Sequence, residues 1–206
     1  MAEFDEKAKE WDTPDKKERA EHIGAAISSQ LPLSNSMTAF EYGCGTGLLS
    51  FALKDKLGAM TLADVSDGML GVLEKKIQQH QIKDMKPLKL NLITDPLPKA
   101  RFDIIYTMMT LHHISDTEKI LRKFYTLLKP GGYLCIADLD KEDGSFHGKE
   151  VENVHRGFNR DNLDSLAMDI GFSPANFITA YHMEHEINDA GETDTFPIFL
   201  MTAHKK

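Results

Sequence analysis

The stretch Glu41-Tyr42-Gly43-Cys44-Gly45-Thr46-Gly47 decides the fold of this chain. It lies between an apolar segment, Thr38–Tyr42, that predicts a strand and a segment, Leu48–Lys56, that predicts a helix. Glycines at every second position let the backbone approach a ligand where a β-carbon would clash, and the start of the helix offers free N–H groups. The spacing GxGxG differs from the GxGxxG of dinucleotide-binding turns, and glycine-rich turns also occur as plain structure. The stretch predicts a strand–turn–helix unit with a candidate ligand site at the turn.

Outward from this turn, short apolar strands alternate with helical segments, which is the pattern of βαβ units around a parallel sheet. Later strands are predicted at Met60–Asp64, Leu88–Leu92, Phe102–Thr107, Tyr133–Asp138, Phe177–Tyr181 and Pro197–Ala203, the last two forming a closing hairpin around a polar loop. Further helices are predicted at Pro14–Gln30, Gly68–Gln79, Asp116–Leu128 and Asn159–Asp169. Lys129-Pro130-Gly131-Gly132 predicts a turn. The fold class is therefore α/β, with a seven-stranded and mostly parallel sheet.

The second predicted strand ends in an acidic residue, Asp64, which follows Gly47 by 17 positions. A carboxylate at this place can accept two hydrogen bonds from a ribose diol. The alternative is a carboxylate that caps the following helix, a role for which Asp67 competes. Because the carboxyl ends of parallel strands meet at one edge of a sheet, we expect Asp64 to lie beside the glycine turn and to bind a ribose.

Composition limits the classes of partner. The chain has 206 residues and a formal net charge of −8, which suits one domain over residues 1–206 with residues 1–30 as a helical cap. An acidic surface repels phosphate backbones, so nucleic acid is not expected as a partner. No apolar run is long enough to span a bilayer, and the charged N-terminus lacks the apolar core of a signal peptide, so no membrane partner is expected.

The cysteines point to a reducing compartment. The chain has two of them, Cys44 and Cys135, and no CxxC spacing. A disulfide framework needs more cysteines, and no metal site is expected. A cytoplasmic location follows from these observations.

Several motifs occur in one order along residues 38–138. After the glycine turn come Asp64-Val65-Ser66-Asp67-Gly68-Met69-Leu70, then Asn91 with Pro96-Leu97-Pro98, then TMMTLHHI at 107–114, and finally LLKPGG at 127–132. In this combination the chain resembles the class I S-adenosylmethionine-dependent methyltransferases, in the small-molecule branch of the UbiE/methyltransferase-11 or -12 type. The resemblance implies a Rossmann-like sheet with helices on both faces, a C-terminal antiparallel hairpin and S-adenosylmethionine as the cofactor.

The resemblance also implies roles for single residues. Glu41 would receive the amino group of the cofactor, directly or through water. The three glycines, Gly43, Gly45 and Gly47, would line its methionine and ribose portions, and Asp64 would hold both ribose hydroxyls.

Other residues would contact the two ends of the cofactor. Val65 and Met69 would pack on the adenine faces. Asn91 would bind the exocyclic amine, in place of the aspartate that many members carry, and the backbone of Leu92 would contact the ring. Thr107 and Met108 would lie beside the methionine end.

Candidates for acid–base chemistry are less specific, because a sulfonium is already a good methyl donor and a base is needed only for a protonated nucleophile. His112 can face an acceptor pocket or hold a loop. Asp138 ends the fifth predicted strand and can act at the reactive edge or cap a turn. His147 belongs to residues 139–160, an insertion that this fold commonly places near its acceptor site, together with His155, Arg156 and Arg160.

Three functions remain open from the sequence. The first is transfer of a methyl group from S-adenosylmethionine to a small-molecule acceptor by in-line displacement, which yields S-adenosylhomocysteine. The second is an NAD-dependent oxidoreductase on a similar sheet, which the GxGxG spacing and the LLKPGG turn oppose. The third is a non-catalytic module that binds S-adenosylmethionine. The sequence leaves the acceptor and the oligomeric state undetermined.

Overall fold

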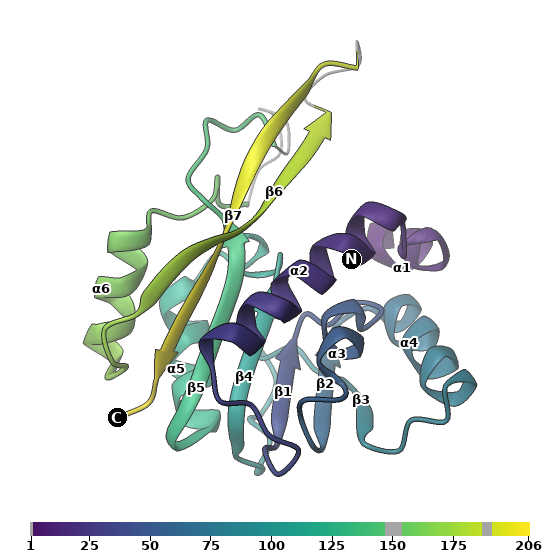
Figure 1. The fold of residues 1–206 in the computed structure, drawn as a ribbon, viewed down its shortest axis with the longest axis horizontal. Coiled ribbons are helices and arrows are strands. Elements are labelled where there is room, and N and C mark those ends of the chain that lie inside the picture. The colour runs from purple at the N-terminus through teal and green to yellow at the C-terminus, as the bar shows by residue number, and fades with distance from the viewer. Residues whose placement is uncertain (1, 147–153, 187–190) are drawn as a thin grey trace.

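The computed structural model describes residues 2–146, 154–186 and 191–206. Seven strands form one sheet in the order β3-β2-β1-β4-β5-β7-β6 (Figure 1). Their bounds are β1 Ala39–Tyr42, β2 Met60–Asp64, β3 Met85–Lys89, β4 Phe102–Met108, β5 Leu128–Leu139, β6 Asn176–Glu186 and β7 Thr193–His204. Strands β1 to β5 are parallel, whereas β7 is antiparallel to both β5 and β6. The expected mostly parallel sheet with a C-terminal hairpin is confirmed.

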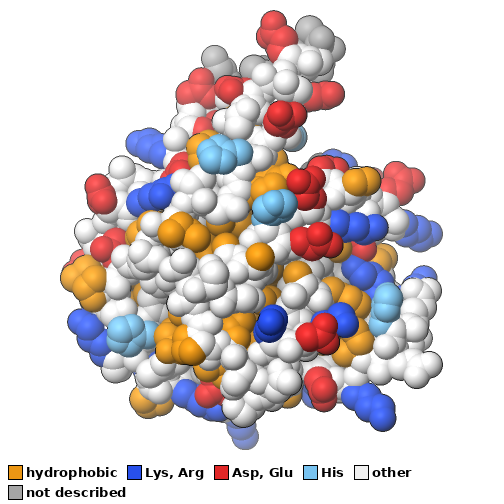
Figure 2. Space-filling model, viewed as in Figure 1, with side chains coloured by type: hydrophobic (Ala, Val, Ile, Leu, Met, Phe, Trp, Pro, Cys, Tyr) orange, Lys and Arg blue, Asp and Glu red, His pale blue; other side chains and the backbone are white. Residues whose placement is uncertain are grey.

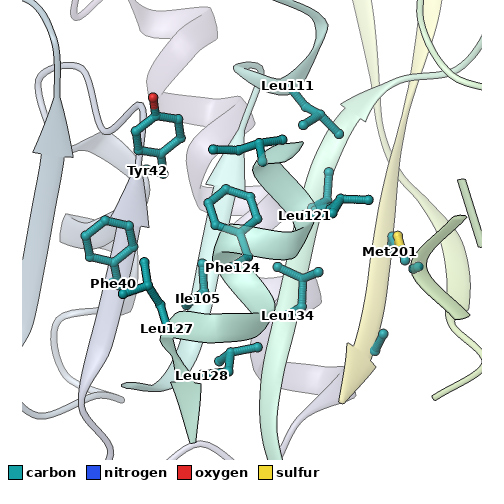
Figure 3. Close-up of a cluster of buried hydrophobic side chains, with 14 of the residues drawn as sticks. Phe40, Tyr42, Ile105, Leu111, Leu121, Phe124, Leu127, Leu128, Leu134 and Met201 are labelled. Atoms are coloured by element: carbon teal, nitrogen blue, oxygen red, sulfur yellow. The ribbon is translucent and has the colours of Figure 1, made fainter. Parts of the chain in front are cut away.

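Helices cover both faces of this sheet, as the sequence predicted. They are α2 Pro14–Gln30, α3 Leu48–Leu53 and α4 Asp67–Gln79 on one face, and α5 Thr117–Leu127 and α6 Arg160–Ile170 on the other. Each face carries its own apolar core, because successive residues of a strand point to opposite sides. On β4, for example, Ile105 packs toward α5 (Figure 3), while Ile104 and Tyr106 pack toward α2 and α3.

The order in which successive strands are added to the sheet reverses between β1 and β4. Ala39 of β1 pairs with Met60 of β2 on one side and with Ile104 of β4 on the other. From β1 the chain moves outward to β2 and β3, and it then returns to β4 on the opposite side of β1. In open α/β sheets, ligands bind outside the carboxyl ends of the strands at such a switch point. The fold thus creates one preferred crevice, next to the glycine turn.

Three predictions about local structure are wrong in detail. The third strand was expected at Leu88–Leu92, whereas β3 spans Met85–Lys89. The expectation was wrong because Leu90 and Leu92 are buried in the loop that follows the strand and therefore gave that loop a strand-like apolar pattern. The Lys129–Gly132 segment was expected to be a turn but lies within β5, where Gly131 N–H donates to the carbonyl of Lys205 at 2.9 Å. The polar loop expected inside the hairpin is mostly paired strand, since β6 and β7 pair from Asn176 with Thr202 to Glu186 with Thr193.

The β6–β7 hairpin extends beyond the rest of the sheet (Figure 1). Figure 2 shows acidic side chains gathered on its projecting end, where Glu184, Glu186 and Asp194 are exposed. The remaining surface in this view mixes acidic and basic side chains. No helix in the described ranges has the length and apolar character that crossing a membrane requires.

The N-terminal segment is helical before α2. It consists of α1 Ala2–Lys7 and a short 3-10 helix, η1 Ala8–Glu10. Two aromatic residues, Phe4 and Trp11, meet edge to face with ring centroids 5.8 Å apart. The segment contacts α4, so it lies near the carboxyl ends of β1 and β2.

Candidate functional site

A cavity of about 470 Å³ lies at the carboxyl ends of the central strands. Its size falls in the range of small-molecule sites. The wall combines the glycine turn, the ends of β1, β2 and β4, and the N-terminal segment, and its residues are Phe4, Trp11, Arg19, Glu41, Tyr42, Gly43, Cys44, Gly45, Thr46, Leu48, Asp64, Val65, Met69, Asn91, Ile93, Met108, Met109, Thr110, His113, Ile114 and Ser115. Segments far apart in sequence therefore build one pocket.

The glycine turn runs close to its neighbours. Gly43 and Gly47 have φ values of 70° and 83°, which L side chains rarely adopt. A β-carbon at Gly43 would lie 2.3 Å from the side chain of Thr110, and one at Gly47 would lie 2.6 Å from Leu73. Gly43 and Gly45 line the cavity, whereas Gly47 lies behind it against α4. The turn therefore needs glycine both for its conformation and for its packing.

Asp64 connects the end of β2 to the glycine turn. Its Oδ2 accepts a hydrogen bond from Gly45 N–H at 2.7 Å, and its Oδ1 accepts from Ser66 N–H at 2.9 Å. Helix α4 is capped by the hydroxyl of Ser66, which accepts from Met69 N–H, so the capping role does not fall to Asp64. A carboxylate has about four acceptor sites, and Asp64 lines the cavity. It can hold the turn and still accept hydrogen bonds from a diol.

Glu41 is a buried carboxyl group in the cavity wall, 2% exposed. The hydroxyl of Ser50 donates to its Oε2, and Ser50 is in turn hydrogen-bonded to the hydroxyl of Tyr106 at 2.6 Å. Burial raises the pKa of Glu41 to about 8, against an ordinary value of 4.5, although the Ser50 hydrogen bond opposes this shift. Near neutral pH the group is therefore mostly protonated until a cation approaches it.

The expected adenine-binding residues are divided between wall and interior. Val65, Met69 and Asn91 line the cavity. The side-chain oxygen of Asn91 already accepts from Ile93 N–H at 2.9 Å, which leaves one lone pair for a ligand. Leu92 is fully buried, and its N–H donates to the Tyr42 hydroxyl at 3.2 Å. Leu92 therefore lies behind the wall and not in it.

At the end of β4, only one of the two expected residues reaches the cavity. Met108 lines it, whereas Thr107 is buried and donates from its hydroxyl to the carbonyl of Tyr42 at 2.8 Å. The next residue, Met109, has a φ of 51°, a strained conformation for a residue with a side chain. Met109 also lines the cavity. The sequence analysis did not identify it, because backbone strain leaves no mark in residue type.

The candidate pair of His112 and Asp138 lies outside the cavity wall. His112 Nδ1 is 2.6 Å from Asp138 Oδ1, and both side chains are at most 2% exposed. Asp138 also accepts from the N–H groups of Leu111 at 2.9 Å and Leu139 at 2.8 Å. The pair therefore holds the short helix η2, Leu111–His113, against the end of β5. The neighbouring His113 does line the cavity.

The expected acceptor-side insertion, residues 139–160, is described only in part. His147 lies outside the described residues. The cationic group around it is engaged elsewhere, since Arg160 makes a two-pronged contact with Asp140 at 2.6 and 2.7 Å. His155 Nε2 lies 2.9 Å from the carbonyl oxygen of Ile114. Nothing in the described part of the chain brings three or more potential metal ligands together.

Arg19 is a residue of the wall that the sequence analysis missed. It lies on α2, four residues before Ile23 and eight before Ile27, and is 9% exposed. These three residues share one face of the helix. A charged residue within an apolar stripe was therefore the feature of the sequence that could have identified Arg19. The predicted pattern used the apolar members of this stripe and ignored the arginine.

Comparison with known proteins agrees with this architecture. Residues 40–136 match the family described as "Methyltransferase domain". An uncharacterized methyltransferase of Schizosaccharomyces pombe is 30% identical over 159 residues, which make up 70% of this chain and 56% of that protein. A ubiquinone biosynthesis O-methyltransferase of Coxiella burnetii is 28% identical over 147 residues, 68% of this chain and 62% of that protein. The chain thus spans about 56% to 62% of the length of these relatives.

The crystal structure of the YcgJ protein from Bacillus subtilis has the same fold, with a TM-score of 0.76 and 15% identity over 90% of this chain and 98% of that one. The sheet order and the glycine turn are those of an open α/β fold, in which ligands bind outside the carboxyl ends of the strands. The chain is similar to the class I S-adenosylmethionine-dependent methyltransferases of the UbiE/methyltransferase-11 type in its family-model match, its relatives and its fold. These matches lend no support to the NAD-dependent alternative.

Proposed function

We propose that this chain binds S-adenosylmethionine in the cavity at the carboxyl ends of β1, β2 and β4 and catalyses transfer of its methyl group to a small-molecule acceptor. The observation that carries the proposal is the convergence of Glu41, Gly43, Gly45 and Asp64 on one cavity. Two carboxyl groups beside a close-packed turn suit a ligand with an amino group and a ribose diol.

Each residue of the wall would have a separate task in holding the cofactor. Asp64 would accept hydrogen bonds from the ribose hydroxyls. Glu41 would lose its proton when an ammonium group approaches, since a nearby positive charge favours the ionised carboxylate. Val65 and Met69 would provide apolar contacts for the adenine, and Asn91 would accept a hydrogen bond from its amine.

When bound, the cofactor supplies an electrophilic methyl group on a sulfonium sulfur. The acceptor atom forms a bond to this carbon, the carbon–sulfur bond breaks, and its electron pair stays on sulfur. The chain contributes position and exclusion of water, and alignment of this kind can supply roughly 7–11 kcal/mol of the barrier. A dedicated base is required only for an acceptor that is protonated at the working pH.

A small molecule is favoured as the acceptor because the N-terminal segment covers the cavity. Phe4 and Trp11 both line it, and Phe4 also meets the ring of His113 edge to face at 5.7 Å. These contacts narrow the cavity on the side of the N-terminal segment, which suits a small molecule better than a folded macromolecule. The net charge of −8 likewise disfavours nucleic acid as a substrate.

The test has two stages. Calorimetry with S-adenosylmethionine, S-adenosylhomocysteine and NAD should show binding of the first two only. A screen of small molecules with methyl-labelled S-adenosylmethionine should then show label transferred to an acceptor, and the transfer should be lost in Asp64→Ala. Binding of NAD without the S-adenosyl ligands would refute the proposal. Binding of the S-adenosyl ligands without transfer to any acceptor would favour the non-catalytic module.

A further inference from the structure

Strand β6 forms an open edge of the sheet, in contrast to β3 at the opposite edge. In the described part of the chain it pairs with β7 alone (Figure 1). Strand β3 carries Pro87, which has no N–H to offer, and two exposed lysines, Lys86 and Lys89. Proline and lysine keep an edge strand from pairing with another chain, and β6 contains neither. A register shift between Thr179 and Tyr181 interrupts its ladder with β7, so the regular open edge is the stretch after this shift.

The outward-facing backbone groups of this stretch belong to His182, Glu184 and Glu186, which are all exposed. The carbonyl oxygen of Pro197 on β7 accepts from Asp140 N–H at 3.1 Å, so the backbone of Pro197 faces β5 and turns away from β6. His182 lies directly opposite Pro197, and at such a position of an antiparallel ladder both residues turn their backbone groups away from each other. The N–H and C=O of His182 therefore face outward. Those of Glu184 and Glu186 do the same, because backbone directions alternate along a strand.

The side chains on this edge form a self-complementary charge pattern. His182 and Glu184 are two positions apart and share one face of β6. If two β6 strands pair in antiparallel fashion around Met183, His182 of each copy lies opposite Glu184 of the other. Both members of each pair then exchange their outward-facing backbone hydrogen bonds, and an imidazole meets a carboxylate. A pairing centred on Glu184 would instead place two glutamates opposite each other, which is unfavourable.

The position of this edge adds a reason for it to gain a further strand. The hairpin of β6 and β7 projects beyond the rest of the sheet (Figure 1). A two-stranded hairpin is only marginally stable in water, whereas three or more strands support one another. Pairing of two such hairpins would give each of them this support.

We propose that this chain forms a two-fold homodimer by antiparallel pairing of β6 with β6 of a second copy, centred on Met183. The interface is isologous, because each copy contributes the same edge. Neither His182 nor Glu184 lines the cavity, so the inference does not depend on the proposed methyl transfer. A pair of strands buries less than the roughly 1,200 Å² at the lower end of stable interfaces, and the dimer is therefore weak and dependent on concentration.

The test measures the mass of the protein in solution by sedimentation velocity over a range of concentrations. The variants are His182→Glu, Glu184→Lys and the double variant that carries both changes. Asp194→Lys is the matched control, because it changes the net charge as Glu184→Lys does, on an exposed residue of β7, which lies behind the edge. Circular dichroism and the melting temperature show whether each variant is folded.

We expect wild type to pass from monomer to dimer between roughly micromolar and millimolar concentration. Each single variant removes the opposite charge from both symmetric pairs and should raise the dimer Kd by at least about tenfold. The double variant exchanges the two signs and should restore the wild-type Kd. Asp194→Lys should keep the dimer, although its net charge equals that of Glu184→Lys.

Hydrogen exchange should locate the contact on the edge. The N–H groups of His182 and Glu184 face outward in the monomer, so they should exchange more slowly at concentrations where the dimer forms. The N–H of Met183 faces β7 and should change little. Protection that appears elsewhere and spares His182 and Glu184 would assign the dimer to another surface and refute the inference.

Three results of sedimentation would also overturn it. The first is a wild-type protein that stays monomeric up to about 1 mM, which needs no variant to fold. The second is a dimer that His182→Glu and Glu184→Lys weaken no more than Asp194→Lys does. The third is a folded double variant whose dimer is as weak as that of the single variants, because the two positions then do not face each other.

Discussion

Lys76 of α4 donates a hydrogen bond to Asp12 of the N-terminal segment, with 2.7 Å between Nζ and Oδ2. The same ammonium group donates to the carbonyl oxygen of Thr46 at 3.0 Å, and the hydroxyl of Thr46 donates to the other oxygen of Asp12. A second contact lies nearby, where Asp5 accepts from Gly68 N–H at 2.8 Å. The segment that carries Trp11 is therefore fastened to the glycine turn and to the start of α4.

This attachment makes the N-terminal segment a candidate lid. Lys76→Met should release it, with a longer-wavelength emission of Trp11, the single tryptophan, and faster protease cleavage before Pro14. An ion pair of this exposure contributes about 1 kcal/mol or less, so S-adenosylhomocysteine affinity should fall by up to about fivefold. Lys75→Met is the control, because Lys75 is exposed. Identical emission and cleavage in both variants and wild type, with and without ligand, would show that the segment is not a lid.

Asp64 should be needed for binding more than for folding. Asp64→Ala removes the acceptor for a ribose diol and for Gly45 N–H, and it should weaken S-adenosylhomocysteine binding by about 1.5–3 kcal/mol, roughly 10- to 150-fold in Kd. Calorimetry measures this loss. Asp67→Ala removes an exposed carboxylate in the same segment and should leave the affinity nearly unchanged. Equal affinity of Asp64→Ala and wild type would make Asp64 purely structural.

Glu41 should make stability depend on pH. Its pKa is raised to about 8 in the folded protein by burial, above an ordinary value of 4.5. Between these values the folded state binds more protons than the unfolded state, so the free energy of unfolding of the ligand-free protein should fall as pH rises through this window. The slope from this group is at most about 1.4 kcal/mol per pH unit. Urea unfolding across the window measures it, and Glu41→Gln should remove that part of the slope.

The same group should make cofactor binding release a proton. Near neutral pH, Glu41 has to ionise to pair with an ammonium group, so S-adenosylhomocysteine affinity should rise with pH until the ligand's amino group loses its own proton. Calorimetry in buffers of different ionisation enthalpy counts the released proton. If the affinity of wild type for S-adenosylhomocysteine changes with pH no more than the affinity of Glu41→Gln does, Glu41 does not pair with the amino group.

Asp138 should matter chiefly for stability. Asp138→Ala leaves His112 Nδ1 and the N–H groups of Leu111 and Leu139 without their acceptor in the core. Each unsatisfied buried donor costs about 1–3 kcal/mol, so we expect a loss of at least about 2 kcal/mol in urea unfolding. Asp140→Ala breaks an ion pair with Arg160 whose side chains are 29% and 24% exposed, so water can partly replace it and the loss should be smaller. A stable Asp138→Ala protein with normal cofactor affinity but no methyl transfer would instead make the carboxylate catalytic.

The sequence by itself determined the parts of this protein whose cause is local. Helix α2 and strand β2 begin and end where Pro14, Gln30 and the apolar pattern predicted, because helix starts and strand periods depend on neighbouring residues. The glycine turn was predicted for the same reason, since positive φ values restrict which residues fit. The end of β3 was predicted at the wrong residue because Leu90 and Leu92 are buried in a loop. Alternating apolar residues in a buried loop give the same sequence pattern as a strand.

Only the tertiary structure decided which distant groups meet. Asp138 and His112 both resembled catalytic residues in the sequence, but the fold pairs them with each other 26 positions apart and buries them outside the cavity. Arg19 was not singled out in the sequence, but the fold packs it against Met183, 164 positions away, and its Nε finds no hydrogen-bond partner among the residues that the structure describes. Residue type gives the chemistry that a side chain can perform. Burial and partners decide whether that chemistry is used, and both arise only when the sheet brings its strands together.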